Sequence, residues 1–287
     1  MKIWMNGEII DESEAMIPVQ DHGFLYGMGL FETFRTYDGQ PFLLTQHLER
    51  LSASCAELKI PCTLQLQPIT AVVHQLLSIN KLADGYFRLT ISAGIAPLGL
   101  PGAQGYDRPN VILMVKELPL PSNTSRPLAL LSVRRNSPEG SIRRKAAHYL
   151  NNILAKWELA DRTVPSSAEG VFINQQGHLT EGIVSNLFFI HSGILYTPAL
   201  ETGCLPGVTR SAVLQLAKQL DICSEVGYYN WDKLSQANEV FITNSIQGIT
   251  PVDTLWDLKD QVIKQWETST GSLTERLTVA YAEWTRS

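Results

Sequence analysis

Lys145 is the residue of this sequence whose position first suggests chemistry. It lies in SIRRKAAHYLNNILAKWEL, residues 141–159, near the start of a predicted amphipathic helix. A helical wheel places the apolar side chains of this segment on one continuous stripe, which predicts a buried face with Lys145 at its edge. The stripe consists of Ala146, Tyr149, Leu150, Ile153, Leu154 and Trp157.

Two interpretations of Lys145 are open. Its ammonium group could reach water while the methylene stem covers apolar surface. Alternatively, the amine is partly desolvated, which lowers its pKa, and Arg143 and Arg144 would lower that pKa further if they point toward it. A neutral amine is a nucleophile that forms Schiff bases with carbonyl compounds, including pyridoxal phosphate, and can then carry protons. The second interpretation requires a phosphate site and a partner for a pyridine ring.

Two segments offer groups for a phosphate. In PGVTRSAVLQLAKQL, residues Gly207, Val208 and Thr209 stand at the start of a predicted helix. Free backbone amides, the helix dipole and the Thr209 hydroxyl suit an anion there, although Thr209 could equally be an ordinary helix cap. Asn244 and Ser245 follow the predicted strand NEVFIT and are either further donors or turn residues.

Glu181 and Arg50 complete the set of candidate residues. Glu181 follows a predicted hairpin in HLTEG. An inward carboxylate there could keep a pyridine nitrogen protonated, so that the ring withdraws electrons; otherwise Glu181 is a solvated surface residue. Arg50 lies opposite the leucine stripe of its helix and faces either solvent or a cleft, where its planar guanidinium would suit a phosphate.

The elements that must position these residues begin with a region of strands and helices. We expect strands in KIWMNG, LFETFRTY and YFRLTISAG, a hairpin turn at residues 38–40, and helices from near Thr45 and over about residues 67–80. The first helix carries the apolar stripe Leu44, Leu48, Leu51, Cys55 and Leu58. The loop at residues 94–110 holds four glycines and three prolines, so it is either a binding lid or a surface excursion.

A second region follows the proline-rich stretch LPLPSNTSRP. We place a linker at residues 119–127, between an N-terminal domain at 1–118 and a larger, strand-rich C-terminal domain at 128–287. The second domain should contain strands in EGVFIN, HLTEG, NLFFI and ILYTP, joined by turns. We then expect a helix from about Val208, the strand NEVFIT ending in a loop NSIQGITPV, and a final amphipathic helix.

The charge, the cysteine spacing and the length of the apolar runs argue against several classes of protein. The net charge of -5 and the pI near 5.7 give no basic excess for a nucleic-acid partner. The four cysteines form no CxxC pair or ligand spacing, so we expect neither a disulfide framework nor a metal site, and we expect a reducing cytoplasm. No apolar run reaches the length of a signal peptide or a membrane span.

Together these segments resemble the fold-type IV enzymes that use pyridoxal phosphate, a family that includes branched-chain and D-amino-acid aminotransferases and aminodeoxychorismate lyases. The similar segments run in order from DHGFLYGMGLFETFR at residues 21–35 through HLERL, RRKAAHYLNNILAK, LTEGIVSNLFFI and LPGVTR to NSIQGITPV, which ends at residue 252. The resemblance implies a two-domain α/β (α+β) fold like that of D-amino-acid aminotransferase, with a smaller α/β N-terminal domain.

By that resemblance Lys145 would be the Schiff-base lysine and proton shuttle, and Glu181 would pair with the pyridine nitrogen. Tyr149, one helical turn after Lys145, could reach the phenolic oxygen of the cofactor. The residues around the phosphate would be Arg50, Val208, Thr209 and Ser245, with Asn244 beside them. Phe31 and Arg88 are candidate substrate contacts, Arg88 through a carboxylate, unless it is a structural surface arginine. A homodimer acting on a small amino substrate is also implied.

Within the family, FETFRTYDG and the run YLNN most resemble the bacterial aminodeoxychorismate lyases. This implies conversion of 4-amino-4-deoxychorismate to 4-aminobenzoate and pyruvate, in folate synthesis. Two alternatives are open: a transaminase of branched-chain or D-amino acids with the same cofactor and lysine, and a catalytically silent binding protein on the same fold. The first differs in the fate of the proton removed from the substrate, and the second would bind no cofactor at Lys145.

Overall fold

The chain divides into two compact units. The structure, a computed structural model, describes residues 1–119, 125–266 and 271–286. The first unit comprises Met1–Leu120 and Arg144–His148, and the second comprises Pro121–Arg143 and Tyr149–Thr285. Residues 120–124, which make up most of the predicted linker, lie outside the described residues. Lys145 therefore belongs to the first unit, although the chain has already entered the second before reaching it.

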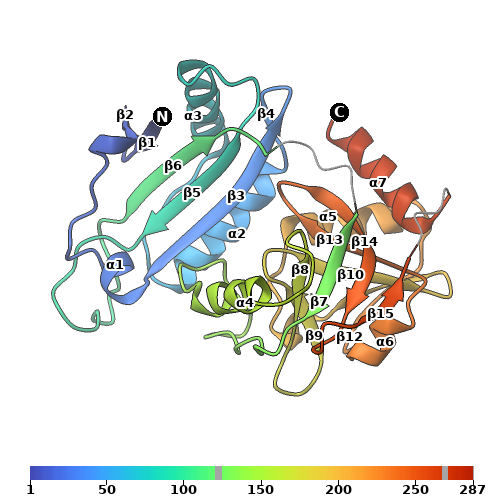
Figure 1. Cartoon of the computed structure of the whole chain (residues 1–287). Coiled ribbons are helices and arrows are strands. Elements are labelled where there is room, and N and C mark those ends of the chain that lie inside the picture. Colours follow the sequence, from blue (N-terminus) through green and yellow to red (C-terminus); the bar gives the residue numbers. More distant parts are fainter. Residues whose placement is uncertain (120–124, 267–270, 287) are drawn as a thin grey trace. The chain divides into compact units, whose positions relative to one another are not determined.

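The first unit is a six-stranded sheet in the order β2-β1-β6-β5-β3-β4, with α2 and α3 packed on one face (Figure 1). Every neighbouring pair in this sheet is antiparallel. The elements are β1 Lys2–Met5, β2 Glu8–Asp11, a 3-10 turn Glu12–Glu14, α1 His22–Tyr26, β3 Gly29–Tyr37, β4 Gln40–Pro41, α2 Leu44–Glu57, α3 Leu66–Ile79, β5 Tyr86–Ser92 and β6 Asn110–Lys116. The strands, the hairpin turn and both helices predicted for this region are confirmed.

Alternation along the strands explains this packing. On β5 the side chains of Phe87, Leu89 and Ile91 are fully buried toward the helices, while Arg88 and Thr90 between them point to the other face. The predicted stripe of α2 is buried against the same core, with Leu58 at its edge. Burying each leucine stabilises the fold by roughly 1.5–3 kcal/mol, so this stripe fixes α2 on the sheet.

The loop at residues 94–110 is tied to the first unit at several points. Buried His22 donates its backbone N–H to the Gly94 carbonyl, and its Nε2 lies 3.0 Å from the Pro97 carbonyl. Its Nδ1 lies 3.1 Å from the Tyr106 hydroxyl. The Tyr106 backbone N–H donates to the Lys59 carbonyl, and the Lys59 ammonium donates to the Ala103 carbonyl at 2.7 Å. The loop is therefore an anchored part of this unit.

The second unit contains nine strands whose pairing closes on itself. β10 pairs with β13 on one edge and β9 on the other, so β10, β13, β14, β7, β8 and β9 form a ring. The remaining strands extend from this ring: β11 and β12 from β10, and β15 from β14. The strands are β7 Arg126–Leu130, β8 Glu169–Ile173, β9 Leu179–Gly182, β10 Asn186–His191, β11 Ile194–Pro198, β12 Ser224–Gly227, β13 Glu239–Asn244, β14 Gly248–Trp256 and β15 Val262–Gln265.

Helices cover this sheet. They are α4 Leu150–Ala160, a 3-10 turn Leu200–Thr202, α5 Val208–Gln219, α6 Trp231–Ser235 and α7 Leu273–Trp284. The hairpins, the helix opening at Val208 and the final helix were predicted correctly. The predicted loop NSIQGITPV is partly wrong, because β14 begins at Gly248 and only residues 245–247 form the loop. Gly248 has a φ of +68°, which lets the chain reverse directly into the next strand.

The predicted helix start near Lys145 is wrong. Helix α4 begins at Leu150, and residues 145–147 run extended beside β3. The Phe31 N–H donates to the Lys145 carbonyl at 2.9 Å, and the Ala147 N–H donates to the Gly29 carbonyl at 2.9 Å. These bonds to a neighbouring strand outweigh the helical pattern. Tyr149 is consequently not one helical turn beyond Lys145 but the N-terminal cap residue of α4, in the second unit.

The predicted buried stripe of this helix is also wrong. Leu150 and Trp157 are 66% and 61% exposed, and Ile153 and Leu154 are exposed too. The buried residues of α4 are instead Asn152, Ala155 and Leu159, of which Ala155 and Leu159 pack with Phe172 of β8. A helical wheel locates the apolar face of a helix but does not show what packs against it. The apolar face of α4 is exposed to solvent.

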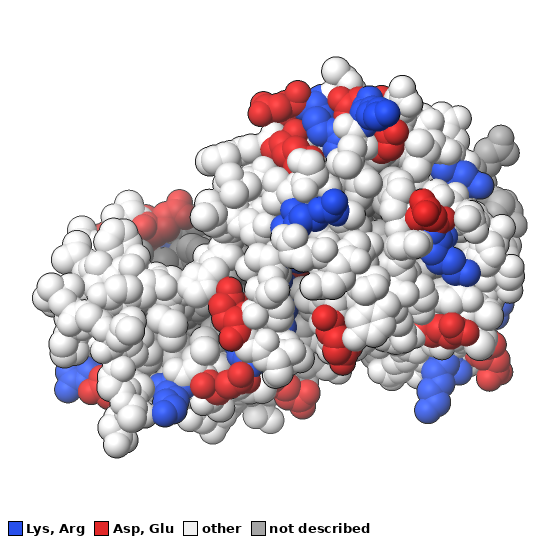
Figure 2. All heavy atoms as spheres, turned by 90° about the horizontal axis from the view of Figure 1, so that it is seen from below, with Lys and Arg blue, Asp and Glu red and all other residues white. Residues whose placement is uncertain are grey.

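Charged groups of both signs lie on the face of the molecule drawn in Figure 2. Figure 2 shows one face of the molecule, where acidic and basic side chains are interspersed among uncharged ones. Within residues 1–119, 125–266 and 271–286, no helix is long and apolar enough to cross a membrane.

A pair of glycine substitutions tests the anchoring of the 94–110 loop. Gly94 and Gly99 both have positive φ, so alanine strains the backbone at either site by about 1 kcal/mol. At Gly94 the added carbon would also overlap the Arg108 carbonyl, whereas at Gly99 nothing lies within 4 Å. We expect Gly94→Ala to lower the free energy of unfolding by roughly 1–3 kcal/mol more than Gly99→Ala in urea titrations. Equal losses would contradict the packing described.

Candidate functional site

Lys145 lies beside an aromatic ring on the helix-free face of the first sheet. Its side chain is half-buried, and Nζ lies 4.6 Å from the centre of the Phe31 ring. The guanidinium carbon of Arg88 lies 3.6 Å from the same ring centre. Cations at such distances are attracted to the face of an aromatic ring. The structure thus brings together three of the predicted residues, Lys145, Phe31 and Arg88.

The arginines before Lys145 point toward acceptors of their own. Arg144 pairs with Glu57 at the end of α2. The Arg143 Nε donates to the Gly203 carbonyl and lies 3.6 Å from Glu181. Each of the two guanidinium groups therefore lies beside a carboxylate, Arg144 in the first unit and Arg143 in the second.

Arg50 binds a buried carboxylate that sequence reasoning missed. Its Nε and Nη2 donate to the two carboxylate oxygens of Glu32 at 2.8 and 2.6 Å, and His47 Nδ1 lies 2.6 Å from Glu32 Oε2. Glu32 is 1% exposed and lies on the helix-facing side of β3, between Leu30 and Phe34. An acidic residue on a strand face that is otherwise apolar was the available signal.

The charges of this cluster explain its titration. Burial raises the pKa of Glu32, but the charge of Arg50 and the hydrogen bonds from His47 and Arg50 outweigh it, and the pKa falls to about 2. Burial lowers the pKa of His47, so a neutral imidazole donates Nδ1–H to the carboxylate. One arginine therefore neutralises Glu32, and the fork of Arg50 is fixed in direction by both oxygens.

Glu181 is a buried carboxylate in the second unit. Oε1 accepts from Arg135 Nε at 2.8 Å, and Oε2 accepts from the Leu205 backbone N–H at 2.8 Å. At 5% exposed it is no solvated surface residue, so the inward carboxylate predicted here is confirmed. Each carboxylate oxygen can accept more than one bond, which leaves capacity for a further donor such as a ring N–H.

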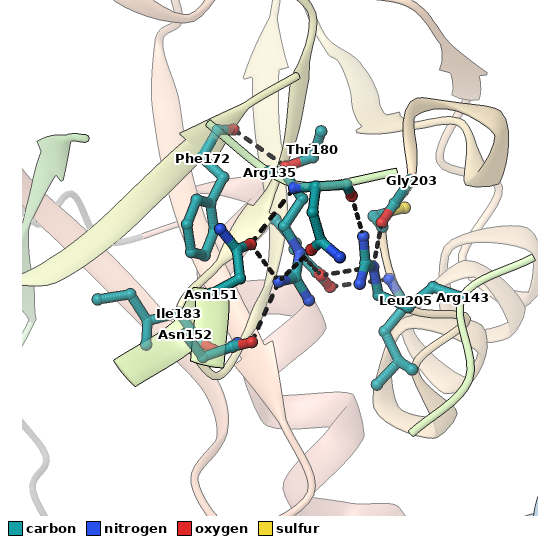
Figure 3. Close-up of polar contacts among 12 residues, drawn as sticks. Arg135, Arg143, Asn151, Asn152, Phe172, Thr180, Ile183, Gly203 and Leu205 are labelled. Carbon is teal, nitrogen blue, oxygen red and sulfur yellow. Dashed lines mark hydrogen bonds and ion pairs between the residues drawn. The ribbon is translucent and has the colours of Figure 1, made fainter. Parts of the chain in front are cut away.

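Arg135 is a buried partner of Glu181 that the sequence analysis did not identify. Its Nη1 donates to Asn151 Oδ1 at 2.7 Å and to Asn152 Oδ1 at 3.1 Å, while its guanidinium carbon lies 5.1 Å from the centre of the Phe172 ring (Figure 3). Asn152 in turn donates to the Ile183 carbonyl at 2.6 Å. The asparagines of the YLNN run thus hold the arginine that binds Glu181. Apart from the residues next to it, the sequence contains no pattern that marks Arg135 as the partner of a buried carboxylate.

The start of α5 forms a cradle for an anion. Val208 and Thr209 are buried in its first turn, where backbone N–H groups have no intrahelical acceptor, and no side chain caps the helix. The Thr209 hydroxyl lies 3.4 Å from the Ser245 hydroxyl. At Gly207 any side chain would overlap the amide of Asn186, so only glycine permits this approach. The hydroxyls, the amides and the helix dipole fit a phosphate.

Asn244 supports this cradle from behind. Its Oδ1 accepts from the backbone N–H groups of Ile246 and Gln247 at 3.0 and 2.8 Å, and its Nδ2 donates to the Gln247 side chain. Asn244 therefore acts as a turn residue that fixes the direction of Ser245. Of the two possibilities predicted for Asn244, the structure favours the turn.

Glu181 and the cradle are joined within the second unit. Leu205, whose N–H binds Glu181, lies two residues before Gly207, and the Asn186 side chain donates to the Leu205 carbonyl at 2.9 Å. Asn186 also pairs with Glu181 across β9 and β10. A buried acceptor for a ring N–H and an anion cradle, linked through Leu205, have the chemistry that a phosphorylated pyridine requires.

The Glu32 cluster makes a testable contribution to stability. The pKa of Glu32 is about 2 in the folded protein and 4.5 in its ordinary state, so its stabilisation is complete above pH 4.5 and is lost as the pH falls toward 2. Between pH 5 and pH 3, we expect wild type to lose on the order of 2 kcal/mol more than Glu32→Gln in urea unfolding. Glu49→Gln, exposed on α2 next to Arg50, serves as the control and should follow wild type.

Comparisons with known proteins agree with this geometry. A family model described as amino-transferase class IV matches residues 29–255. The aminodeoxychorismate lyase of Bacillus subtilis is 42% identical over 255 residues, which cover 87% of this chain and 85% of the relative.

Solved structures share the fold. A 4-amino-4-deoxychorismate lyase from Pseudomonas aeruginosa superposes with a TM-score of 0.82 at 27% identity and covers 98% of each chain. A branched-chain amino acid aminotransferase of Escherichia coli superposes with a TM-score of 0.84 at 27% identity over 98% of this chain and 93% of that one. The predicted fold-type IV architecture is confirmed. The chain therefore belongs to the class IV aminotransferase family of pyridoxal-phosphate-dependent enzymes.

Proposed function

We propose that this enzyme is an aminodeoxychorismate lyase, which converts 4-amino-4-deoxychorismate to 4-aminobenzoate and pyruvate. The observation that carries the proposal is the 42% identity to the lyase of Bacillus subtilis over most of both chains. The E. coli branched-chain aminotransferase is only 27% identical over 289 residues. The family resemblance of the YLNN run supports the same choice, since Asn151 and Asn152 shape the surroundings of Glu181 through Arg135.

We propose the following roles toward the cofactor. Lys145 would hold the cofactor through its aldehyde, and the Glu181 carboxylate would accept the N–H of the pyridine ring. Thr209, Ser245 and the first-turn amides of α5 bind the phosphate; Val208 contributes its amide, and Asn244 orients Ser245. The phosphate role of Arg50 and the contact of Tyr149 with the phenolic oxygen rest on the family resemblance alone.

The chain's own residues then divide the work of the reaction. Bound pyridoxal phosphate supplies an aldehyde that condenses with the substrate amine and a ring that withdraws electrons. With its amine free, Lys145 would act as the general base for the proton on the substrate carbon that bears nitrogen. Loss of the enolpyruvyl group makes the substrate ring aromatic, and Lys145 can return the proton to the departing fragment. Arg88 would bind a substrate carboxylate beside Phe31, whose ring excludes water.

A substrate panel tests the reaction. We expect the purified enzyme with pyridoxal phosphate to form equimolar 4-aminobenzoate and pyruvate from 4-amino-4-deoxychorismate, followed by chromatography. Branched-chain or D-amino acids with 2-oxoglutarate should give rates at least about 100-fold lower, because lyase and transaminase transition states need different contacts. Amino transfer without 4-aminobenzoate would overturn the lyase and leave a transaminase of the same family.

Replacement of Lys145 tests its covalent role. After borohydride reduction of the enzyme with pyridoxal phosphate, mass spectrometry should find the adduct on Lys145 and none on the Lys145→Ala protein. Product formation by the variant should fall by at least about 1,000-fold, because both the covalent link and the general base are lost. Lys156, exposed on α4, is the matched control, and Lys156→Ala should retain adduct and activity. An adduct elsewhere in wild type would refute the assignment.

We also propose that the enzyme is a homodimer and works in the cytoplasm. The exposed apolar stripe of α4 supports a dimer, because an exposed aromatic and aliphatic face of this kind is typical of protein interfaces. All four cysteines are free thiols, which is typical of a reducing compartment.

A charge on the α4 stripe tests the dimer. We expect Trp157→Glu to raise the dimer dissociation constant by at least about 100-fold, because it removes an aromatic anchor and buries an unpaired charge. Light scattering after gel filtration should show a dimer for wild type and a monomer for the variant. Val279→Glu, on the exposed side of α7, is the control and should remain dimeric. Wild-type monomer would contradict the proposal.

A further inference from the structure

We infer that Arg135 is a positioning residue for the cofactor, which acts through Glu181 and is held in place by Asn151 and Asn152. The inference rests on the role of Glu181 proposed above and adds a residue that neither the sequence nor the family comparison marks. The geometry points to it because Arg135 is the only described side chain that donates to Glu181 at hydrogen-bond distance.

Glu181 depends on Arg135 more than on any other charge. Both side chains are nearly inaccessible to water, and a buried carboxylate without a cation is strongly disfavoured. The second arginine, Arg143, lies 3.6 Å from Oε1 and directs its Nε to the Gly203 carbonyl. The remaining partner of the carboxylate is one backbone N–H, from Leu205. Without Arg135, the carboxylate would lose its one short charge-assisted bond.

The asparagines determine where Arg135 points. Nη1 is shared between Asn151 and Asn152 at 2.7 and 3.1 Å, while Nε is aimed at Glu181 at 2.8 Å. Asn151 is itself fixed by a bond to the Arg134 carbonyl, and Asn152 by a bond to the Ile183 carbonyl. The planar guanidinium of Arg135 is thus held at Nη1 by the two asparagines and at Nε by Glu181, so it cannot rotate away. The Glu181 carboxylate, bonded to Arg135 through Oε1, therefore keeps one orientation.

Arg135 supplies both a positive charge and a fixed direction for its hydrogen bonds, whereas a lysine could supply only the charge. A lysine at position 135 would keep the positive charge but has a single nitrogen, which cannot reach Glu181 and both asparagines from one plane. The orientation of Glu181 matters because its free lone pair must meet the N–H of the pyridine ring. Arg135 therefore contributes to cofactor binding without touching the cofactor.

A double-mutant cycle on cofactor affinity tests the inference. The dissociation constant of pyridoxal phosphate is measured by tryptophan fluorescence, without substrate, for wild type, Arg135→Gln, Glu181→Gln and the double variant. We expect Arg135→Gln to weaken binding by roughly 10- to 100-fold, the equivalent of a charge-assisted hydrogen bond. In the Glu181→Gln background the same change should alter affinity by less than about twofold. Arg135→Lys should recover only part of the loss.

Controls separate positioning from folding. Arg134→Gln, which removes the exposed neighbouring arginine, should leave affinity unchanged. Asn151→Ala offers a milder variant if Arg135→Gln does not fold, and it should weaken binding only where Glu181 is present. Equal losses in both backgrounds would overturn the inference, because Arg135 would then act on the fold alone. Wild-type affinity in Glu181→Gln would overturn it together with the role of Glu181, whereas an adduct on Lys145 would still support the enzyme assignment.

Discussion

A carboxylate removed from water needs a cation or hydrogen-bond donors, and each unit of this enzyme holds one buried carboxylate that is paired with an arginine. In the first unit Glu32 is met by Arg50, with His47 as a second donor. In the second unit Glu181 is met by Arg135, with Arg143 farther away. Both carboxylates sit on strands, and each arginine comes from another segment, 18 residues away for Arg50 and 46 for Arg135. Breaking either pair would leave a buried charge without compensation.

The two pairs differ in what they leave available. Both oxygens of Glu32 are taken by Arg50 and one of them also by His47, so this carboxylate serves to orient its partners. Glu181 has one guanidinium bond and one backbone bond, which leaves lone pairs for a ligand. The same electrostatic rule therefore yields a structural pair in one unit and a candidate binding pair in the other.

Much of the fold could be predicted from the sequence because its patterns are local. The stripe of α2, the alternation of β3 and the start of α5 at Val208 each follow from residues within one turn or one strand. The segment around Lys145 shows the limit of prediction from local patterns. The segment before α4 has a helical pattern, but hydrogen bonds to the Gly29 carbonyl and from the Phe31 N–H, more than a hundred residues earlier, hold it extended. No local pattern could reveal that competition.

The residues of the candidate site likewise fall into those that a local pattern reveals and those that it does not. Thr209 and Ser245 could be found as short donors at element ends, and Glu181 as an acidic residue in a hairpin. Glu32, His47 and Arg135 could not, because their roles depend on partners brought together by folding. A buried ion pair between residues far apart in the chain produces no recognisable spacing motif in the sequence.

The closed pairing of strands in the second unit has a consequence for handling the protein at high concentration. Within its described residues, ring closure leaves the outer edges of β12 and β15 as the unpaired edges of this sheet, and each is four residues long. Exposed strand edges are templates for intermolecular sheet growth, and short edges that carry charges such as Glu225 and Lys264 are poor ones. This unit should therefore resist fibril-like aggregation while it is folded.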